Sequence, residues 1–237
     1  DVYKRQVTMR KEELRTYIEN HESEMIEDLK SLIRIPSEKQ AAEPGKPFGA
    51  PAAEALAQGI EILEKYGFAV TNYDNYAIAA DFNQEEKGLD ILAHLDVVPA
   101  GEGWQETDPF TPRIKEGKMF GRGTADDKGP AIAAIYAMRA VKELGYPLKK
   151  NVRLVLGSDE ECGSSDLEYY YKKEVEAPCT FSPDAEFPVI NIEKGGMRGH
   201  FEKTSDAGTT GVRLVSLQAG TCLLYTSPSP RDGLLSR

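Results

Sequence analysis

The octapeptide LDILAHLD, residues 89–96, is a nearly continuous apolar run that ends in a histidine and an aspartate. Such a run is typical of a strand buried on both faces, as in a parallel sheet covered by helices. Two more short strands are predicted over residues 152–156 and 179–182. A helix that begins near Gly129 and ends at Gly145 separates the first two strands. This alternation predicts the α/β fold class, with a mostly parallel sheet flanked by helices.

The residues around this unit also follow helix and strand patterns. Apolar residues at helical spacing predict a helix over residues 14–32, which ends before Pro36. The other predicted elements are a helix from Pro51 to Gly67, two strands over 68–73 and 76–82 joined at Asp74-Asn75, and a helix over 165–175.

The composition narrows the class of protein. At 237 residues the chain has room for one large α/β domain, or for one domain and part of another. Its 39 acidic and 29 basic residues give a net charge of −10, and so acidic a surface repels phosphate backbones. No apolar run approaches the roughly 20 residues that cross a bilayer. Three scattered cysteines are too few for a disulfide framework, so we expect a cytoplasmic protein without nucleic-acid or membrane partners.

Both ends of the chain differ from the middle in composition and in the periodicity of their apolar residues. Residues 1–6, DVYKRQ, and residues 221–237, which have Ser/Pro punctuation and no periodicity, resemble translated sequencing-adaptor read-through. We therefore expect both ends to be non-native. After about residue 191 the sequence becomes Gly-rich with strand-like runs, which predicts that a second domain begins there. We expect the natural chain to continue beyond residue 220.

Titratable side chains follow each of the three predicted parallel strands. In open parallel α/β sheets, ligand sites lie beyond the carboxyl ends of the strands. Carboxylates gathered at one edge repel one another without cations, so their joint placement predicts a dinuclear metal site, although each signal alone is weak. One imidazole with several carboxylates suits Zn²⁺, Mn²⁺ or Co²⁺ better than Ca²⁺. The residues concerned are His94 and Asp96 after the first strand, Asp126 and Asp127 before the helix, Asp159, Glu160 and Glu161 after the second strand, and Asp184 after the third.

The chemistry of a dinuclear metal site requires two distinct roles of its carboxylates. Two cations about 3.5–4 Å apart need a bridging carboxylate, because a carboxylate offers one oxygen to each metal. The adjacent residues Glu160 and Glu161 then take different roles. One glutamate binds metal, while the other stays free as the general base that deprotonates a water.

Four ordered segments carry a resemblance to a known family. They resemble the dinuclear-zinc exopeptidases, which include carboxypeptidase G, acetylornithine deacetylase, aminoacylase and bacterial dipeptidases, and they are most similar to the dipeptidase V branch. The resemblance implies a zinc-peptidase catalytic domain, of which residues 7–192 are the N-terminal part, and the beginning of an α+β lid domain over residues 193–220. The segments are ILAHLDVVPAGEGW (91–104), FGRGTADDKGP (120–130), GSDEECGSSDL (157–167) and SPDAEFPVINIEKG (182–195).

The resemblance also implies a role for each site residue. Asp126 matches the carboxylate that bridges two zinc ions, and Asp127 is its neighbour across a cis peptide bond. Glu160 matches the general base, and Asp96 matches the carboxylate that orients the histidine ligand from behind. The implied metal ligands are His94 and Asp184 on the first zinc ion, Glu161 on the second, and Asp126 on both.

The implied reaction is hydrolysis of the peptide bond of a dipeptide or other small peptide-like substrate. A metal-bridging water, deprotonated by Glu160, attacks the carbonyl polarised by zinc, and Glu160 passes the proton to the leaving amine. The family completes its second zinc site with a late histidine, whereas this sequence has only His21, His94 and His200. We expect His21 on the surface and His200 in a lid strand, so the chain itself is expected to be weakly active or inactive.

Two alternatives to the zinc-dependent dipeptidase remain open. The same scaffold serves N-acyl amino acid deacylases and desuccinylases, which would prefer acylated amino acids to unblocked dipeptides. A non-catalytic binding fragment, truncated in nature, would account for the missing late histidine. For the dipeptidase we expect two zinc ions, with Mn²⁺ or Co²⁺ as substitutes.

Overall fold

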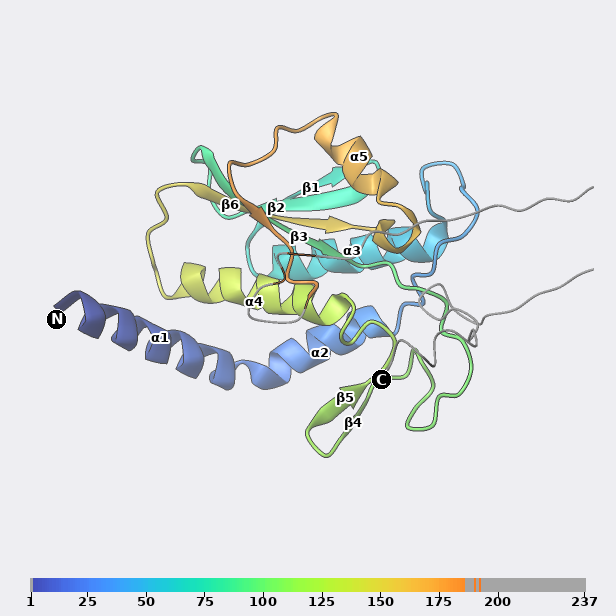
Figure 1. Ribbon diagram of the computed structural model, residues 1–237, viewed down its shortest axis with the longest axis horizontal. Coiled ribbons are helices and arrows are strands. Elements are labelled where there is room, and N and C mark those ends of the chain that lie inside the picture. The colour runs from blue at the N-terminus through green and yellow to red at the C-terminus, as the bar shows by residue number, and fades with distance from the viewer. Residues whose placement is uncertain (1, 186–189, 191, 193–237) are drawn as a thin grey trace, which may run out of the picture. The chain divides into compact units, whose positions relative to one another are not determined.

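The computed structural model describes residues 2–185, 190 and 192 (Figure 1). The chain divides into two compact units, Asp1–Asp184 and Ala185–Arg237, and the first unit holds every helix and strand assigned within the described residues. The expected lid segment 193–220, including His200, and the expected tail 221–237 lie outside the described residues. Among the described helices, none combines the length and the apolar character that a membrane span needs.

One sheet forms the centre of the first unit. Its strands are β1 (Ala69–Tyr73), β2 (Ala77–Asp81), β3 (Lys87–His94), β6 (Asn151–Gly157) and β7 (Thr180–Phe181). They lie in the order β1-β2-β6-β3-β7, with β3 parallel to both β6 and β7, and β2 antiparallel to β1 and to β6. The predicted α/β class is confirmed, and the sheet is mixed because β2 runs against both of its neighbours.

Helices flank this sheet on both faces (Figure 1). On one face Leu56, Ile132 and Leu154 are fully buried in the larger apolar cluster, whereas Val155 and Tyr170 belong to a smaller cluster on the other face. Leu154 and Val155 are neighbours in β6 and point to opposite faces, as successive strand residues do. The helices are α1 (Val2–Asn20), α2 (Glu22–Ile33), α3 (Ala50–Lys65) and α4 (Lys128–Glu143), and α5 (Ser165–Tyr171) beside the smaller cluster.

Local structure departs from the predicted pattern in three places. The helix predicted over 14–32 is two helices, α1 and α2, which are separated at His21. The helix predicted over 165–175 ends at Tyr171. An additional hairpin, which no sequence pattern indicated, is made of β4 (Arg113–Lys115) and β5 (Lys118–Phe120).

The register of the parallel strands brings the loops that follow them to one edge. His94, the last residue of β3, lies opposite Gly157, the last residue of β6. β7 pairs with β3 on its other side, so the segment that leads to Asp184 leaves the sheet at the same edge. The residues before α4 reach this edge as well, because the backbone N–H of His94 donates a hydrogen bond to the Asp127 carboxylate.

Candidate metal centre

His94 is the last residue of β3 and is 2% exposed. Its Nδ1 atom is 3.0 Å from the backbone oxygen of Asp96 and 3.2 Å from Oδ1 of the same residue. Its Nε2 atom faces three carboxylates, at 3.1 Å from Asp126 Oδ1, 3.3 Å from Asp184 Oδ2 and 3.8 Å from Glu160 Oε2. One nitrogen is therefore anchored within the protein, and the other is turned to a group of oxygen atoms.

Asp96 connects the two loops that follow β3 and β6. Its carboxylate is 1% exposed and accepts hydrogen bonds from the backbone N–H groups of Glu160, at 3.2 Å, and Glu161, at 3.1 Å. Because the same carboxylate also contacts Nδ1 of His94, it fixes the histidine ring and the start of the Glu160–Cys162 turn relative to each other.

Asp126 and Asp127 are joined by a cis peptide bond, and their carboxylates have different surroundings. The Asp126 side chain is half exposed and contacts His94 Nε2. Asp127 is fully buried, with Oδ2 3.0 Å from the backbone nitrogen of His94, while Oδ1 has no hydrogen-bond partner among the described residues. Burial raises the pKa of Asp127 to about 7. The sequence singled out Asp127 only as a neighbour of Asp126, since nothing in the pair Asp-Asp indicates which carboxylate is buried.

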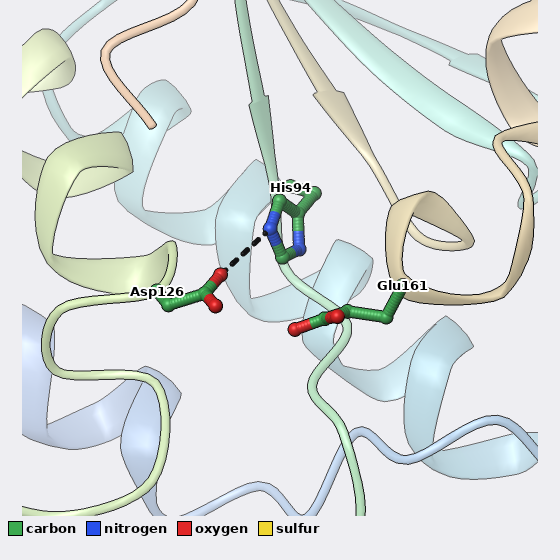
Figure 2. A group of neighbouring side chains, drawn as sticks. All are labelled: His94, Asp126 and Glu161. Carbon is green, nitrogen blue, oxygen red and sulfur yellow. Dashed lines mark hydrogen bonds and ion pairs between the residues drawn. The ribbon is translucent and has the colours of Figure 1, made fainter. Parts of the chain in front are cut away.

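The donor atoms form two overlapping groups that suit a divalent cation. His94, Asp126 and Glu161 form one group, and His94, Asp127 and Asp184 form the other, with donor atoms within 4.8 Å of one another in each. In Figure 2 the carboxylates of Asp126 and Glu161 lie on two sides of the His94 ring and come from different segments. Four-coordinate zinc with bonds of about 2.0–2.1 Å separates its donor atoms by about 3.3 Å. The 3.1 and 3.3 Å separations from His94 Nε2 fit that requirement.

The charges of these side chains also favour a bound cation. Burial raises the pKa of Glu161 to about 7, and the neighbouring Asp126 charge adds to the rise. Burial also raises the pKa of Glu160. The pKa of His94 is raised, because hydrogen bonds to Asp126, Asp184 and Asp96 outweigh the lowering effect of its burial. The pKa of Asp126 is instead lowered, because its carboxylate contacts His94. A bound cation would favour the charged form of each of these carboxylates.

The structure brings together seven of the eight residues that the sequence placed at this edge, namely His94, Asp96, Asp126, Asp127, Glu160, Glu161 and Asp184. Asp159, from the same acidic turn, is buried away from His94. One carboxylate oxygen lies 2.6 Å from Lys39 Nζ, and the other accepts hydrogen bonds from the backbone N–H and the hydroxyl of Ser165. A cavity of about 160 Å³ adjoins the group and is lined in part by Leu92, Leu167 and Glu160.

Comparison with known proteins relates the segment that carries these residues to a family. Residues 91–206 match the family described as Peptidase family M20/M25/M40. The matched segment is just under half of the chain. The match includes each of the residues nominated above, from His94 to Asp184, so the converging side chains lie within the matched segment.

The chain is also similar to individual proteins. Protein YtjP of Bacillus subtilis is 41% identical over 174 residues, which are 73% of this chain and 37% of that protein. Beta-Ala-Xaa dipeptidase of Lactobacillus delbrueckii is 42% identical over 174 residues, 72% of this chain and 37% of that enzyme. Human carnosine dipeptidase 1 shares the fold with a TM-score of 0.63 and 29% identity, over 72% of this chain and 40% of that one. The chain thus spans 37% of the length of the first two of these relatives.

Proposed function

We propose that this chain forms the metal-binding part of a metal-dependent dipeptidase with two zinc ions. The observation that carries the proposal is the convergence of three carboxylates on Nε2 of His94. The match of residues 91–206 to Peptidase family M20/M25/M40 supports it, as does the similarity to a Beta-Ala-Xaa dipeptidase and to a carnosine dipeptidase. A histidine with several carboxylates favours zinc, with manganese or cobalt as substitutes.

The proposed ligands divide between two positions. His94, Asp126 and Asp184 would hold one cation, and Asp126 and Glu161 would contribute to the second, with Asp126 between them. When bound, divalent cations supply Lewis-acid polarisation of the scissile carbonyl and lower the pKa of water. Asp96 keeps Nε2 of His94 aimed at the site by holding Nδ1 from behind.

Glu160 is proposed as the group that moves the proton. Its backbone is fixed by Asp96, while its carboxylate is half exposed, 3.8 Å from His94 Nε2. Such a carboxylate can accept a proton from water and deliver it to the leaving amine nitrogen. Burial raises the pKa of Glu160, which makes the group a better proton acceptor. Asp127 is too deeply buried to reach a substrate and is assigned no proton transfer.

The substrate and the compartment are part of the proposal. We propose unblocked dipeptides, because both named relatives with a stated activity are dipeptidases. We propose the cytoplasm because Cys162 and Cys179 are free, exposed thiols, as expected in a reducing compartment.

The test is hydrolysis of dipeptides by a chimera, since the chain spans about a third of its relatives. In the chimera the matching part of this chain replaces the corresponding residues of the Lactobacillus enzyme, and Zn²⁺, Mn²⁺ or Co²⁺ is supplied. We expect release of free amino acids from unblocked dipeptides, and its loss in the Glu160→Gln chimera. Faster hydrolysis of N-acetyl amino acids would favour a deacylase instead. A folded, metal-loaded chimera without either activity would contradict the proposal.

A further inference from the structure

Lys128, the first residue of α4, follows the Asp126-Asp127 pair and is fully buried. Its Nζ atom donates hydrogen bonds to the backbone oxygens of Leu32, at 2.9 Å, and Ile35, at 2.8 Å. These carbonyls lie at the C-terminus of α2 and in the turn that follows it, where the last carbonyl groups of a helix accept hydrogen bonds from side chains. Lys128 therefore joins the start of α4 to the end of a helix distant in sequence.

The stem of Lys128 is enclosed by the loop that carries Asp126. Gly123 in this loop has a φ of +88°, and a Cβ atom placed on it would lie 2.9 Å from Cδ of Lys128 and 3.2 Å from Val97. The same loop is held to the helix by the hydrogen bond from Gly129 N to Gly123 O, at 3.2 Å. A side chain this tightly packed fixes the backbone on either side of it.

The turn after α2 also holds the other loop of the site. Ser37 Oγ donates a 2.5 Å hydrogen bond to the backbone oxygen of Leu95, and the backbone N–H of Val97 donates to Ser37 O at 3.2 Å. Leu95 lies between His94 and Asp96, so these bonds fix the backbone between the histidine and the aspartate that orients it. Ser37 is itself fully buried.

We propose that the turn Ile35–Ser37 is a common anchor for the two loops that carry the metal ligands. Lys128 and Ser37 are positioning residues that set the separation between Asp126 and His94, and they contact neither substrate nor metal. The inference rests on the proposed metal site. Donor groups must be held within about 0.5 Å of their working positions, and groups that orient ligands typically change metal affinity 10–100-fold when they are lost.

The first test is Lys128→Met in the full 237-residue chain, with Co²⁺ as the probe. Methionine retains the apolar stem and removes the donor. The two carbonyls keep their backbone partners, Ile35 N and Ser37 N, so the variant is expected to fold. We expect Co²⁺ to bind at least 10-fold more weakly by titration calorimetry, and the visible absorption spectrum of the bound cobalt to change because the ligand geometry changes.

The matched control is Arg139→Met on the same helix. Arg139 is a cation with little exposure that donates to Glu24 and Glu143, each at 2.7 Å, away from the site. We expect this variant to lose stability yet to bind Co²⁺ within twofold of the parent, with an unchanged spectrum. Both variants are measured at a temperature at which circular dichroism shows them folded. Equal losses of Co²⁺ affinity in the two variants would overturn the inference.

Ser37→Ala keeps the inference falsifiable if Lys128→Met does not fold. It removes only the hydrogen bond to Leu95, and we expect a 3- to 10-fold loss of Co²⁺ affinity with a shifted spectrum. If a folded Ser37→Ala or Lys128→Met variant bound Co²⁺ as tightly as the parent chain, the proposed role of the turn would be overturned. The proposed function would remain intact. A parent chain that binds no Co²⁺ and no Zn²⁺ would overturn both.

Discussion

Asp127 supports His94 through one carboxylate oxygen and leaves the other free. Oδ2 of Asp127 accepts the backbone N–H of His94 at 3.0 Å, while Oδ1 is buried without a hydrogen-bond partner among the described residues. An unpaired buried carboxylate oxygen is costly. Because Asp127 also lies within reach of the His94 and Asp184 donor atoms, we interpret its free oxygen as part of the negative surroundings that attract a cation.

Asp127→Asn separates the charge of this residue from its hydrogen bond. The amide oxygen can still accept the His94 N–H, so we expect the fold to be retained, and the loss of charge is expected to weaken zinc binding about tenfold. Titration calorimetry measures the affinity. Asp127→Ala, which also loses the bond, should bind zinc more weakly still. If Asp127→Asn bound zinc as tightly as the parent, only the hydrogen bond would matter.

Glu160→Gln tests the division of labour within the glutamate pair. We expect the chimera carrying this change to lose about 10²–10⁴-fold in the turnover of dipeptides, because the proton carrier is absent. Its zinc content, measured by atomic absorption, should match that of the parent chimera. The comparison variant Glu161→Gln should instead lose bound zinc. The opposite pattern of zinc loss would mean that the roles of the two glutamates are exchanged.

A bound cation is expected to stabilise the folded chain. The ligands come from separate segments and approach one another only in the folded state, so zinc should bind the folded state far better than the unfolded state. At 100 times its Kd, one zinc ion would raise the free energy of unfolding by about 2.7 kcal/mol. Thermal melts with zinc and then with EDTA measure the rise and its reversal. His94→Ala should show neither, and a similar rise in this variant would place the binding elsewhere.

The lowered pKa of Glu174 predicts that this residue, which lies away from the metal centre, makes a pH-dependent contribution to stability. Burial alone would raise its pKa, but hydrogen bonds to Lys87, Tyr73 and Arg153 lower it to about 2. A lowered pKa in the folded state gives stability that is present above the ordinary value of 4.5 and is lost as the pH falls toward 2. We expect Glu174→Gln to lower the free energy of unfolding by about 2–3 kcal/mol at pH 7.

Urea denaturation at pH 7, 4 and 2.5 measures this contribution. The difference between Glu174→Gln and the parent should shrink as the pH falls. Glu168, whose ion pair with Lys172 is exposed, provides the control, and Glu168→Gln should differ little from the parent at any pH. A constant difference for Glu174→Gln across the pH range would show that packing is responsible.

The sheet and the gathering of the candidate side chains at its edge could be predicted from the sequence, because both follow from short-range patterns, whereas the role of each residue stays a prediction. The apolar run before His94 and the one before Gly157 mark buried strands, and the edge where parallel strands end gathers the residues that follow them. The turn at Asp74-Asn75 was also predictable, since both residues adopt the left-handed conformation that Asn and Asp tolerate.

Other features depend on tertiary contacts that no local pattern reveals. The β4–β5 hairpin turns through Glu116, which has a φ of 52° although glutamate is not a typical residue for that conformation. Lys128 follows two aspartates and has the pattern of an exposed helix start, yet it is fully buried, and its amino group donates to carbonyls at the end of α2 and in the turn that follows. The separation of α1 from α2 at His21 likewise has no proline or glycine to signal it.

The position of Asp96 makes the centre a cooperative unit. One carboxylate contacts the ring of His94 and also holds the backbone of Glu160 and Glu161. The effects of substitutions at these positions should therefore not add, because a change at Asp96 displaces the histidine and the glutamate turn together. A double-mutant cycle between Asp96 and His94 would give a large coupling energy. Loss of the Asp96 carboxylate would thus disturb both loops of the centre at once, through a residue that need not touch the substrate.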